Sequence, residues 1–266
     1  MSDELLKLIH EGQYDQALRT AKRQSIDLLK QNQRGGAARA LAAAGHVLCL
    51  LNSPTKAKSF AQEAYDLASR VEDPVAAGYA LSVGALAQLR LAEFDQADGL
   101  MDRALEALTR HPDEEITAFA RLISAELSLT KEDLAEARVF AEDAWGSPAA
   151  QRSPWIKARA CLVKAVSEER ADDVSGAIEL LNQAEQHLKA QPDAETSWLV
   201  KAAMANACLK SRREKEAETH RREAGAIIEH LASLIPDEGR ERFLKNPAIQ
   251  NARGINSMTG SGMWKV

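Results

Sequence analysis

Small residues recur every 40 residues along this chain, without slippage from the first unit to the last. Self-similarity at a fixed period of roughly 20–50 residues indicates a stacked repeat protein. Such a chain has no single globular core, so the period constrains the architecture before any local prediction is made. The first of three aligned columns holds Ala17, Ala57, Ala97, Ala137, Ala177 and Ala217. A second lies seven residues further on, at Gln24, Ala64, Ala104, Ala144, Ala184 and Ala224, and a third lies twelve residues before the first, at Leu5, Gly45, Ala85, Ala125, Ala165 and Ala205.

Composition predicts that the repeated unit is helical. Hydrophobic residues make up 45% of the 266 residues, but aromatic residues only 5%. Alanine and leucine dominate, and Glu, Lys, Arg and Gln lie between them; these are strong helix formers. No segment shows sustained alternation of β-branched residues, which a half-buried strand requires. The chain is therefore predicted to be all-α.

Charge and cysteine content exclude several functional classes. The net charge of −5, from 34 basic and 39 acidic residues, argues against a nucleic-acid partner, since a polyanion binder carries a basic excess. No apolar run approaches the roughly 20 residues of a membrane span, and the first residues do not resemble a secretory signal. Three widely spaced cysteines in apolar helical runs are typical of reduced core residues. We expect a cytoplasmic protein with no membrane contact.

Each 40-residue unit reads as two amphipathic helices joined by a tight turn. In the third unit Asp73 and Pro74 are typical of a helix start, with Asp as N-cap and Pro at the first helical position. Small side chains where helices cross let the backbones approach closely while larger neighbours fill the grooves. The first helices of the pairs are predicted at about 36–51, 75–91, 114–129, 154–170 and 194–209, and the second at about 55–70, 94–108, 132–145, 174–189 and 213–233.

This pattern resembles the tetratricopeptide repeat (TPR), in which three small positions have the same offsets and an aromatic residue precedes the central alanine by three. That slot here holds Tyr14, Pro54, Phe94, Leu134, Val174 and Glu214. The segments EGQYDQAL, LAEFDQAD and KEDLAEAR look like the turn of the family. The period of 40 exceeds the usual length of about 34, and is similar to a long-helix subgroup in bacterial transcriptional activators and signalling ATPases.

The resemblance implies a right-handed superhelical solenoid of about six helix-turn-helix repeats with a C-terminal capping helix. The predicted repeats are residues 1–31, 34–71, 74–109, 113–146, 154–190 and 193–233, followed by a capping segment at 234–252 and a flexible tail at 253–266. Both end units depart from the pattern, as end units of an array do.

Nothing in the sequence points to catalysis or to a cofactor. Gly35 and Gly36 lack the strand and the Gly-Lys-Ser that a phosphate loop requires. His46 and Cys49 share a helix face, but two ligands without a second pair are a weak case for a metal site. The basic cluster of residues 212–222 alternates with glutamates at pairing distance. We therefore predict no enzyme, no metal and no cofactor.

The first helix of each pair should line the concave face, and its exposed positions are unusually apolar in the middle units. We predict a partner-binding groove made of Tyr79, Leu86, Leu89, Phe119, Leu122, Glu126, Leu129, Arg159, Leu162, Val166, Glu169 and Asn206. A contiguous apolar patch requires a partner to cover it. The alternative is that long helices bury some of these residues between neighbouring repeats.

The leading hypothesis is a non-catalytic scaffold or regulatory adaptor whose groove binds an apolar helix or peptide of another protein. In a variant of it, the groove holds the chain's own tail, through Ile255, Met258, Met263 and Trp264. The alternative function is a sensor of a small signalling peptide or ligand, which acts as the regulatory arm of a bacterial transcription or kinase pathway. The carboxylate clamp of chaperone-binding relatives is absent, because only Asn206 matches its pattern.

Overall fold

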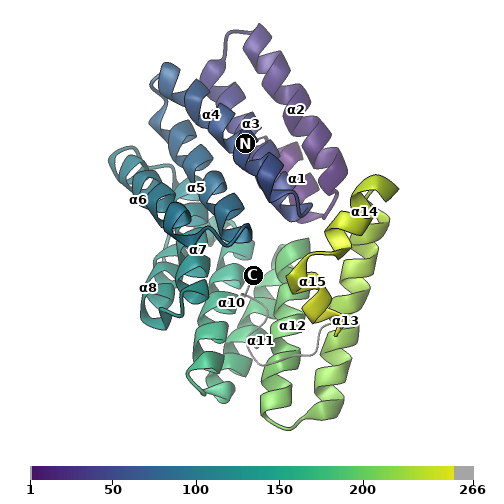
Figure 1. The fold of residues 1–266 in the computed structure, drawn as a ribbon. Coiled ribbons are helices and arrows are strands. Elements are labelled where there is room, and N and C mark those ends of the chain that lie inside the picture. Colours follow the sequence, from purple (N-terminus) through teal and green to yellow (C-terminus); the bar gives the residue numbers. More distant parts are fainter. Residues whose placement is uncertain (1, 255–266) are drawn as a thin grey trace.

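A computed structural model describes residues 2–254, and every regular element in that range is a helix. Figure 1 shows the helices in consecutive antiparallel pairs that wind into a superhelix. The helices are α1 (Asp3–His10), α2 (Tyr14–Lys30), α3 (Arg34–Leu50), α4 (Pro54–Arg70), α5 (Pro74–Arg90), α6 (Phe94–Arg110), α7 (Glu114–Thr130), α8 (Leu134–Trp145), α9 (Pro148–Arg152), α10 (Pro154–Arg170), α11 (Val174–Ala190), α12 (Ala194–Lys210), α13 (Glu214–Ser233), α14 (Asp237–Leu244) and α15 (Pro247–Ala252). Of these, none in the described range is both long and apolar enough to cross a bilayer.

The 40-residue period has a simple structural origin. Most helices from α2 to α12 are 17 residues long, and three residues connect each to the next. A new helix therefore starts every 20 residues, and a pair of helices takes 40. The fourth unit keeps the 20-residue spacing with two helices in place of one. The second helix of that pair, α8, has only 12 residues, and the 5-residue α9 follows it before α10 begins.

The turn within each pair has the same backbone conformation throughout the array. Its middle residue has a positive φ in each case, at Gly12, Asn52, Ala92, Glu132, Asp172 and Arg212. The next residue donates its N–H to a carbonyl five positions back, as Ser53 does to Leu48 at 2.8 Å and Glu93 to Gln88 at 2.9 Å. This bond closes the helix as in a Schellman motif, where glycine is preferred. Only the first of these six turns uses glycine, so the others accept about 1–2 kcal/mol of left-handed strain each.

The three columns of small residues lie at the helix crossings. All six alanines of the first column are fully buried, and the other two columns are buried from the second unit onward. At Gly45 an added Cβ would lie 3.0 Å from Val83 and 3.3 Å from the carbonyl oxygen of Ala57. Gln24, in the first unit, is partly exposed. The small side chains therefore set how closely the helices pack.

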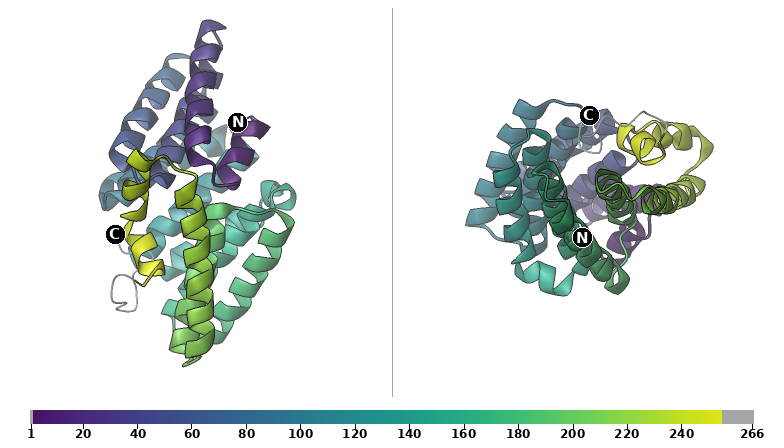
Figure 2. Two further views of the ribbon diagram at one scale, coloured as in Figure 1. Left: turned by 90° about the vertical axis from the view of Figure 1, so that its right-hand side faces the viewer. Right: turned by 90° about the horizontal axis from the view of Figure 1, so that it is seen from below.

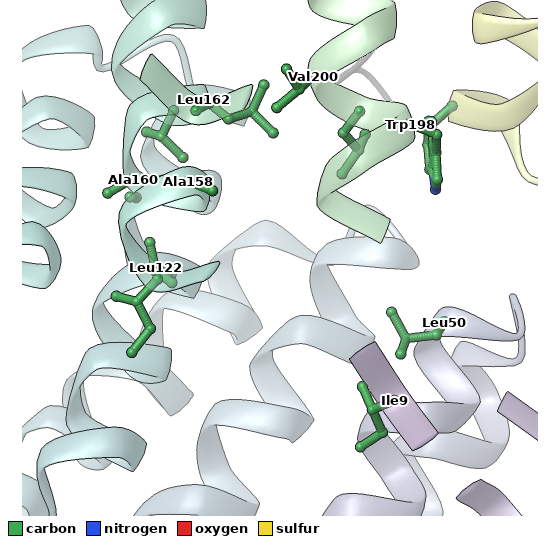
Figure 3. Packing of buried hydrophobic residues seen from close by; sticks show 14 of the residues in the cluster. Ile9, Leu50, Leu122, Ala158, Ala160, Leu162, Trp198 and Val200 are labelled. Atoms are coloured by element: carbon green, nitrogen blue, oxygen red, sulfur yellow. The ribbon is translucent and has the colours of Figure 1, made fainter. Parts of the chain in front are cut away.

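The superhelix closes on itself, so that the first unit meets the last. His10 of α1 pairs with Asp193, just before α12, at 2.8 Å. On the other side of the contact, Asn52 donates a hydrogen bond to the carbonyl of Arg242 in α14 at 2.8 Å. Seen from below, the helices form a ring (Figure 2). Figure 3 shows that buried side chains of one cluster come from α1, α3, α7, α10 and α12.

The C-terminal cap consists of two short helices where the sequence predicted one. Pro247 begins α15, and the side chain of Asn246 accepts the N–H of Ala248. Proline fits the first turn of a helix but not the interior, which separates α14 from α15. Phe243 and Ile249 are buried, and the Phe243 ring lies 6.4 Å from that of Tyr14. The cap therefore packs against the first unit as well as the last.

Candidate functional site: a central cavity

The concave face of the ring encloses a cavity of about 530 Å³. Its walls come from α1, the start of α2, and the first helix of each following pair. Most of the residues that line it fall into columns spaced by 40 positions: Leu6, His46, Leu86 and Glu126; His10, Leu50 and Arg90; Arg39, Tyr79, Phe119 and Arg159; Glu115, Trp155 and Glu195; Ile116, Ile156 and Thr196; and Asp113, Ser153 and Asp193.

Early and late units line the cavity with different parts of their helices. Arg90, at the end of α5, and Glu195, near the start of α12, are both in the wall. The cavity reaches the last turns of α3 and α5, through Leu50 and Arg90. By contrast, α10 and α12 contribute lining residues only from their N-terminal halves.

A buried arginine ties three of these helices together. The Arg159 guanidinium donates from Nε to Oε1 of Glu126 at 2.7 Å, and its Nη2 lies 2.6 Å from the same oxygen. Its Nη1 donates to Glu195 at 3.2 Å. Burial lowers the pKa of Arg159, but the nearby Glu126 and Glu195 charges outweigh it and raise the pKa above its ordinary value. Arg159 is thus held charged between two carboxylates.

A hydrogen-bonded pair, His10 and Asp193, lies where α1 meets α12. Burial raises the pKa of Asp193, but its bonds to His10 and to Thr196 outweigh burial and hold the pKa below the ordinary value. Asp193 also caps α12, since its carboxylate accepts the N–H of Thr196 at 2.8 Å. Burial, followed by the charges of Glu195 and Asp193, raises the pKa of Tyr14 well above the ordinary value. Tyr14 is therefore a neutral phenol in this wall.

Aromatic rings form much of the remaining surface. The His46 ring lies 4.8 Å from that of Phe119, and the Tyr79 ring lies 5.6 Å from Phe119 in an edge-on arrangement. Elsewhere in the cavity wall, the centroids of the His10 and Trp155 rings are 5.3 Å apart. Burial lowers the pKa of His46 to about 4, so the imidazole is neutral near pH 7.

Three polar atoms in the wall are buried without a hydrogen-bond partner among residues 2–254. They are Nδ1 of His46, Oε2 of Glu126 and Oε1 of Gln191. Most buried polar atoms in folded proteins have a partner, because an unpaired one forfeits its hydration without compensation. Glu126 is only 3% exposed. These atoms are therefore available for a hydrogen bond with a molecule bound in the cavity.

Six of the twelve residues predicted for the groove line the cavity: Tyr79, Leu86, Phe119, Leu122, Glu126 and Arg159. The other six lie elsewhere. Leu89, Leu129, Leu162 and Val166 are buried in the packing between helices. Glu169 binds Lys210 at 2.9 Å, and Asn206 is partly exposed outside the cavity wall. The tail residues Ile255, Met258, Met263 and Trp264 lie outside the described residues.

Sequence reasoning did not assign the contributions of α1 and of the starts of α10 and α12. Leu6, His10, Trp155, Asp193 and Glu195 all line the cavity. A sequence signal for these residues was present: Trp155 and Glu195 lie 40 residues apart and so occupy the same position in their repeats. What the sequence does not give is the height at which the superhelix closes.

The three cysteines do not take part in this wall. Cys49, Cys161 and Cys208 are buried free thiols. Within residues 2–254, no three His, Cys, Asp or Glu side chains are grouped as metal ligands.

The fold is that of a TPR-like α-solenoid. A solved structure with this architecture is the crystal structure of the APC/C hetero-tetramer Cut9-Hcn1, which matches with a TM-score of 0.65 over 98% of this chain. The chain spans about half of that protein (47%), and the two are 14% identical, so the likeness shows the fold alone. No family model matches the sequence. No curated protein matches it either.

Proposed function

We propose that this chain is a non-catalytic interaction module, active in the cytoplasm, that binds a short segment of another protein in its central cavity. The observation that carries the proposal is the cavity itself. Its volume of about 530 Å³ is in the usual range for ligand sites, roughly 300–1,000 Å³. Such sites combine apolar walls with a few convergent polar groups. Phe119 and Leu122 supply the first feature, and Glu126 with Arg159 the second.

The closed ring favours an extended or terminal segment over a long helix. An α-helix with its side chains is about 10–12 Å across and needs an open groove along its length. Here α1 and the start of α12 join across the concave face through His10 and Asp193. A few residues in extended conformation fit an enclosed volume of this size better than several helical turns do.

The same enclosure supports a second candidate, a sensor of a small signalling peptide or ligand. Such a sensor acts as the regulatory arm of a bacterial transcription or kinase pathway. Calorimetry with short peptides, compared with copurification of a full-length protein, separates the two candidates. A ligand recovered by mass spectrometry from natively purified protein identifies the small-molecule case directly.

The proposed function is tested by selecting displayed random heptapeptides on the purified chain and measuring their affinities for two variants. Phe119→Ala removes an aromatic wall of the cavity, and we expect it to weaken binding at least tenfold. Phe140→Ala is the matched control, because Phe140 is also partly buried but lies on α8, away from the cavity. Circular dichroism verifies that both variants stay helical. Selected peptides that bind the two variants equally would rule the cavity out.

The tail of the chain is a competitor within this proposal. If residues 255–266 occupy the cavity until a partner displaces them, deletion of residues 254–266 raises the affinity for the selected peptides. Unchanged affinity removes the tail from the proposal and leaves the cavity as the binding site.

A further inference from the structure

We infer, on the basis of the proposed function, that the bound segment carries an ammonium or guanidinium group, and that Glu126 is its acceptor in the cavity. The ligand class is thus a cationic group attached to an apolar body. Its source is either a lysine or arginine side chain of a peptide, or a free small amine.

The charge of the wall favours a cation. Among the described residues that line the cavity, seven are Asp or Glu and four are Lys or Arg. The basic groups nearest Glu126 are already engaged: Arg159 bridges two carboxylates, and Arg90 lies 3.5 Å from Glu195. His46 is neutral near pH 7 and adds no positive charge. An anion would have to break these pairs, whereas a cation would not.

Glu126 offers the specific contact. Both close Arg159 nitrogens approach Oε1, and Oε2 is buried with no partner among residues 2–254. A buried carboxylate oxygen without a donor forfeits its hydration, and a charge-assisted hydrogen bond recovers more than a neutral one does. The side chain reaches the cavity from the middle of α7, so a donor that enters with the ligand can satisfy it.

The aromatic wall suits the same group. Phe119 lines the cavity between the rings of His46 and Tyr79. A cation placed near an aromatic face gains electrostatic attraction in addition to its hydrogen bonds. The apolar side chains of Leu86 and Leu122 provide contact for the methylene groups behind the charge.

The test uses titration calorimetry of the full chain with matched probes. The peptide arm compares acetyl-Leu-Lys-Leu-amide with the same peptide acetylated on the lysine Nζ, which keeps the length but removes the charge. The small-molecule arm compares pentylamine with pentanol. We expect the charged member of at least one pair to bind at least tenfold more tightly than its neutral partner, the gain expected from a buried charge-assisted hydrogen bond.

Two variants then locate the effect. In Glu126→Gln the preference for the charged probe should fall to within about twofold. Glu115→Gln is the matched control, because Glu115 also lines the cavity but is exposed, and the preference should persist there. If Glu126→Gln lowers helical content, Glu126→Asp tests the same contact: it keeps the charge but withdraws the carboxylate by one methylene, and the preference for the charged probe should fall there as well.

The outcomes separate the inference from the proposed function. A charge preference in the peptide arm supports a protein segment as the source, and one in the amine arm alone supports a small ligand. Equal binding of charged and neutral probes overturns the inference and leaves the cavity as a binding site. If no probe binds, the inference also falls, while the proposed function still rests on the selected heptapeptides. A preference that persists in Glu126→Gln overturns the assignment of Glu126.

Discussion

Replacement of Arg159 by methionine should destabilise the protein strongly, although it removes only one side chain from a cavity wall. Arg159 is 6% exposed, and its guanidinium is the only group shown to pair with the Glu126 carboxylate in the described chain. Methionine has similar length and no charge, so the main consequence is a buried carboxylate without a counter-ion.

The size of the effect follows from the burial of each partner. Removal of one partner from a buried ion pair costs about 3–5 kcal/mol. Glu195 is partly exposed and keeps Arg90 at 3.5 Å, so most of the cost falls on Glu126. We expect a loss of about 3–4 kcal/mol. With an unfolding entropy of about 2.1 cal/mol/K per residue, 266 residues give a decrease in Tm of about 6 °C if the array unfolds as one unit.

The assay is urea unfolding of four proteins, followed by circular dichroism: the wild type, Arg159→Met, Glu126→Leu, and the double variant. An apolar pair of similar volume often matches the stability of the ion pair that it replaces. The double variant should therefore be within about 1 kcal/mol of the wild type, and more stable than Arg159→Met alone. A double-mutant cycle isolates this coupling.

Additive costs would refute the reasoning. If the double variant loses the sum of the two single losses, Arg159 and Glu126 act independently and the buried pair is not the source of stability. A loss below about 1 kcal/mol for Arg159→Met is equally contrary, because it places the carboxylate in contact with water.

Three further predictions concern the packing and the titrating groups. Burial lowers the pKa of His46 from its ordinary value of 6.5 to about 4. The folded state therefore keeps its full stability above about pH 6.5, and loses at most about 3 kcal/mol of it as the pH falls towards 4, because the unfolded chain binds the proton first. In urea titrations at several pH values, His46→Gln should remove this part of the pH dependence. Ala97 is fully buried at a helix crossing, so Ala97→Leu should cost about 1–3 kcal/mol, and hydrogen exchange should increase in α5, α6 and α7 more than in α13. Burial raises the pKa of the Cys49 and Cys161 thiols to about 12. Iodoacetamide at pH 8 should therefore label both thiols slowly in the native protein and rapidly in urea, as measured by mass spectrometry. Rapid labelling of the native protein would contradict this prediction.

Much of the fold could be predicted from the sequence, because the packing requirement repeats. Helices of similar length cross at the same positions in each unit, and from the second unit onward these positions hold alanine or glycine, such as Ala97 or Gly45. The turns were less visible. Their left-handed residues Asn52, Ala92 and Glu132 share a conformation but not a residue type, so no glycine signal marks them.

The candidate site could be predicted only in part. The sequence places Phe119, Glu126 and Arg159 on concave helix faces, and all three line the cavity. Leu129 and Leu162 were predicted to line the same groove as these three residues, yet both are fully buried between helices. Which side chains face the cavity depends on how all the helix pairs cross, and that arrangement leaves no local pattern in the sequence.

Closure of the ring changes what a ligand in the cavity can do. In an open array each repeat contacts only its neighbours, so a local perturbation fades along the chain. Here Tyr14 and His10 of the first unit and Asp193 of the last line the same cavity. A ligand that contacts both walls adds its binding free energy to the closed form alone, and thereby links the two ends of the array.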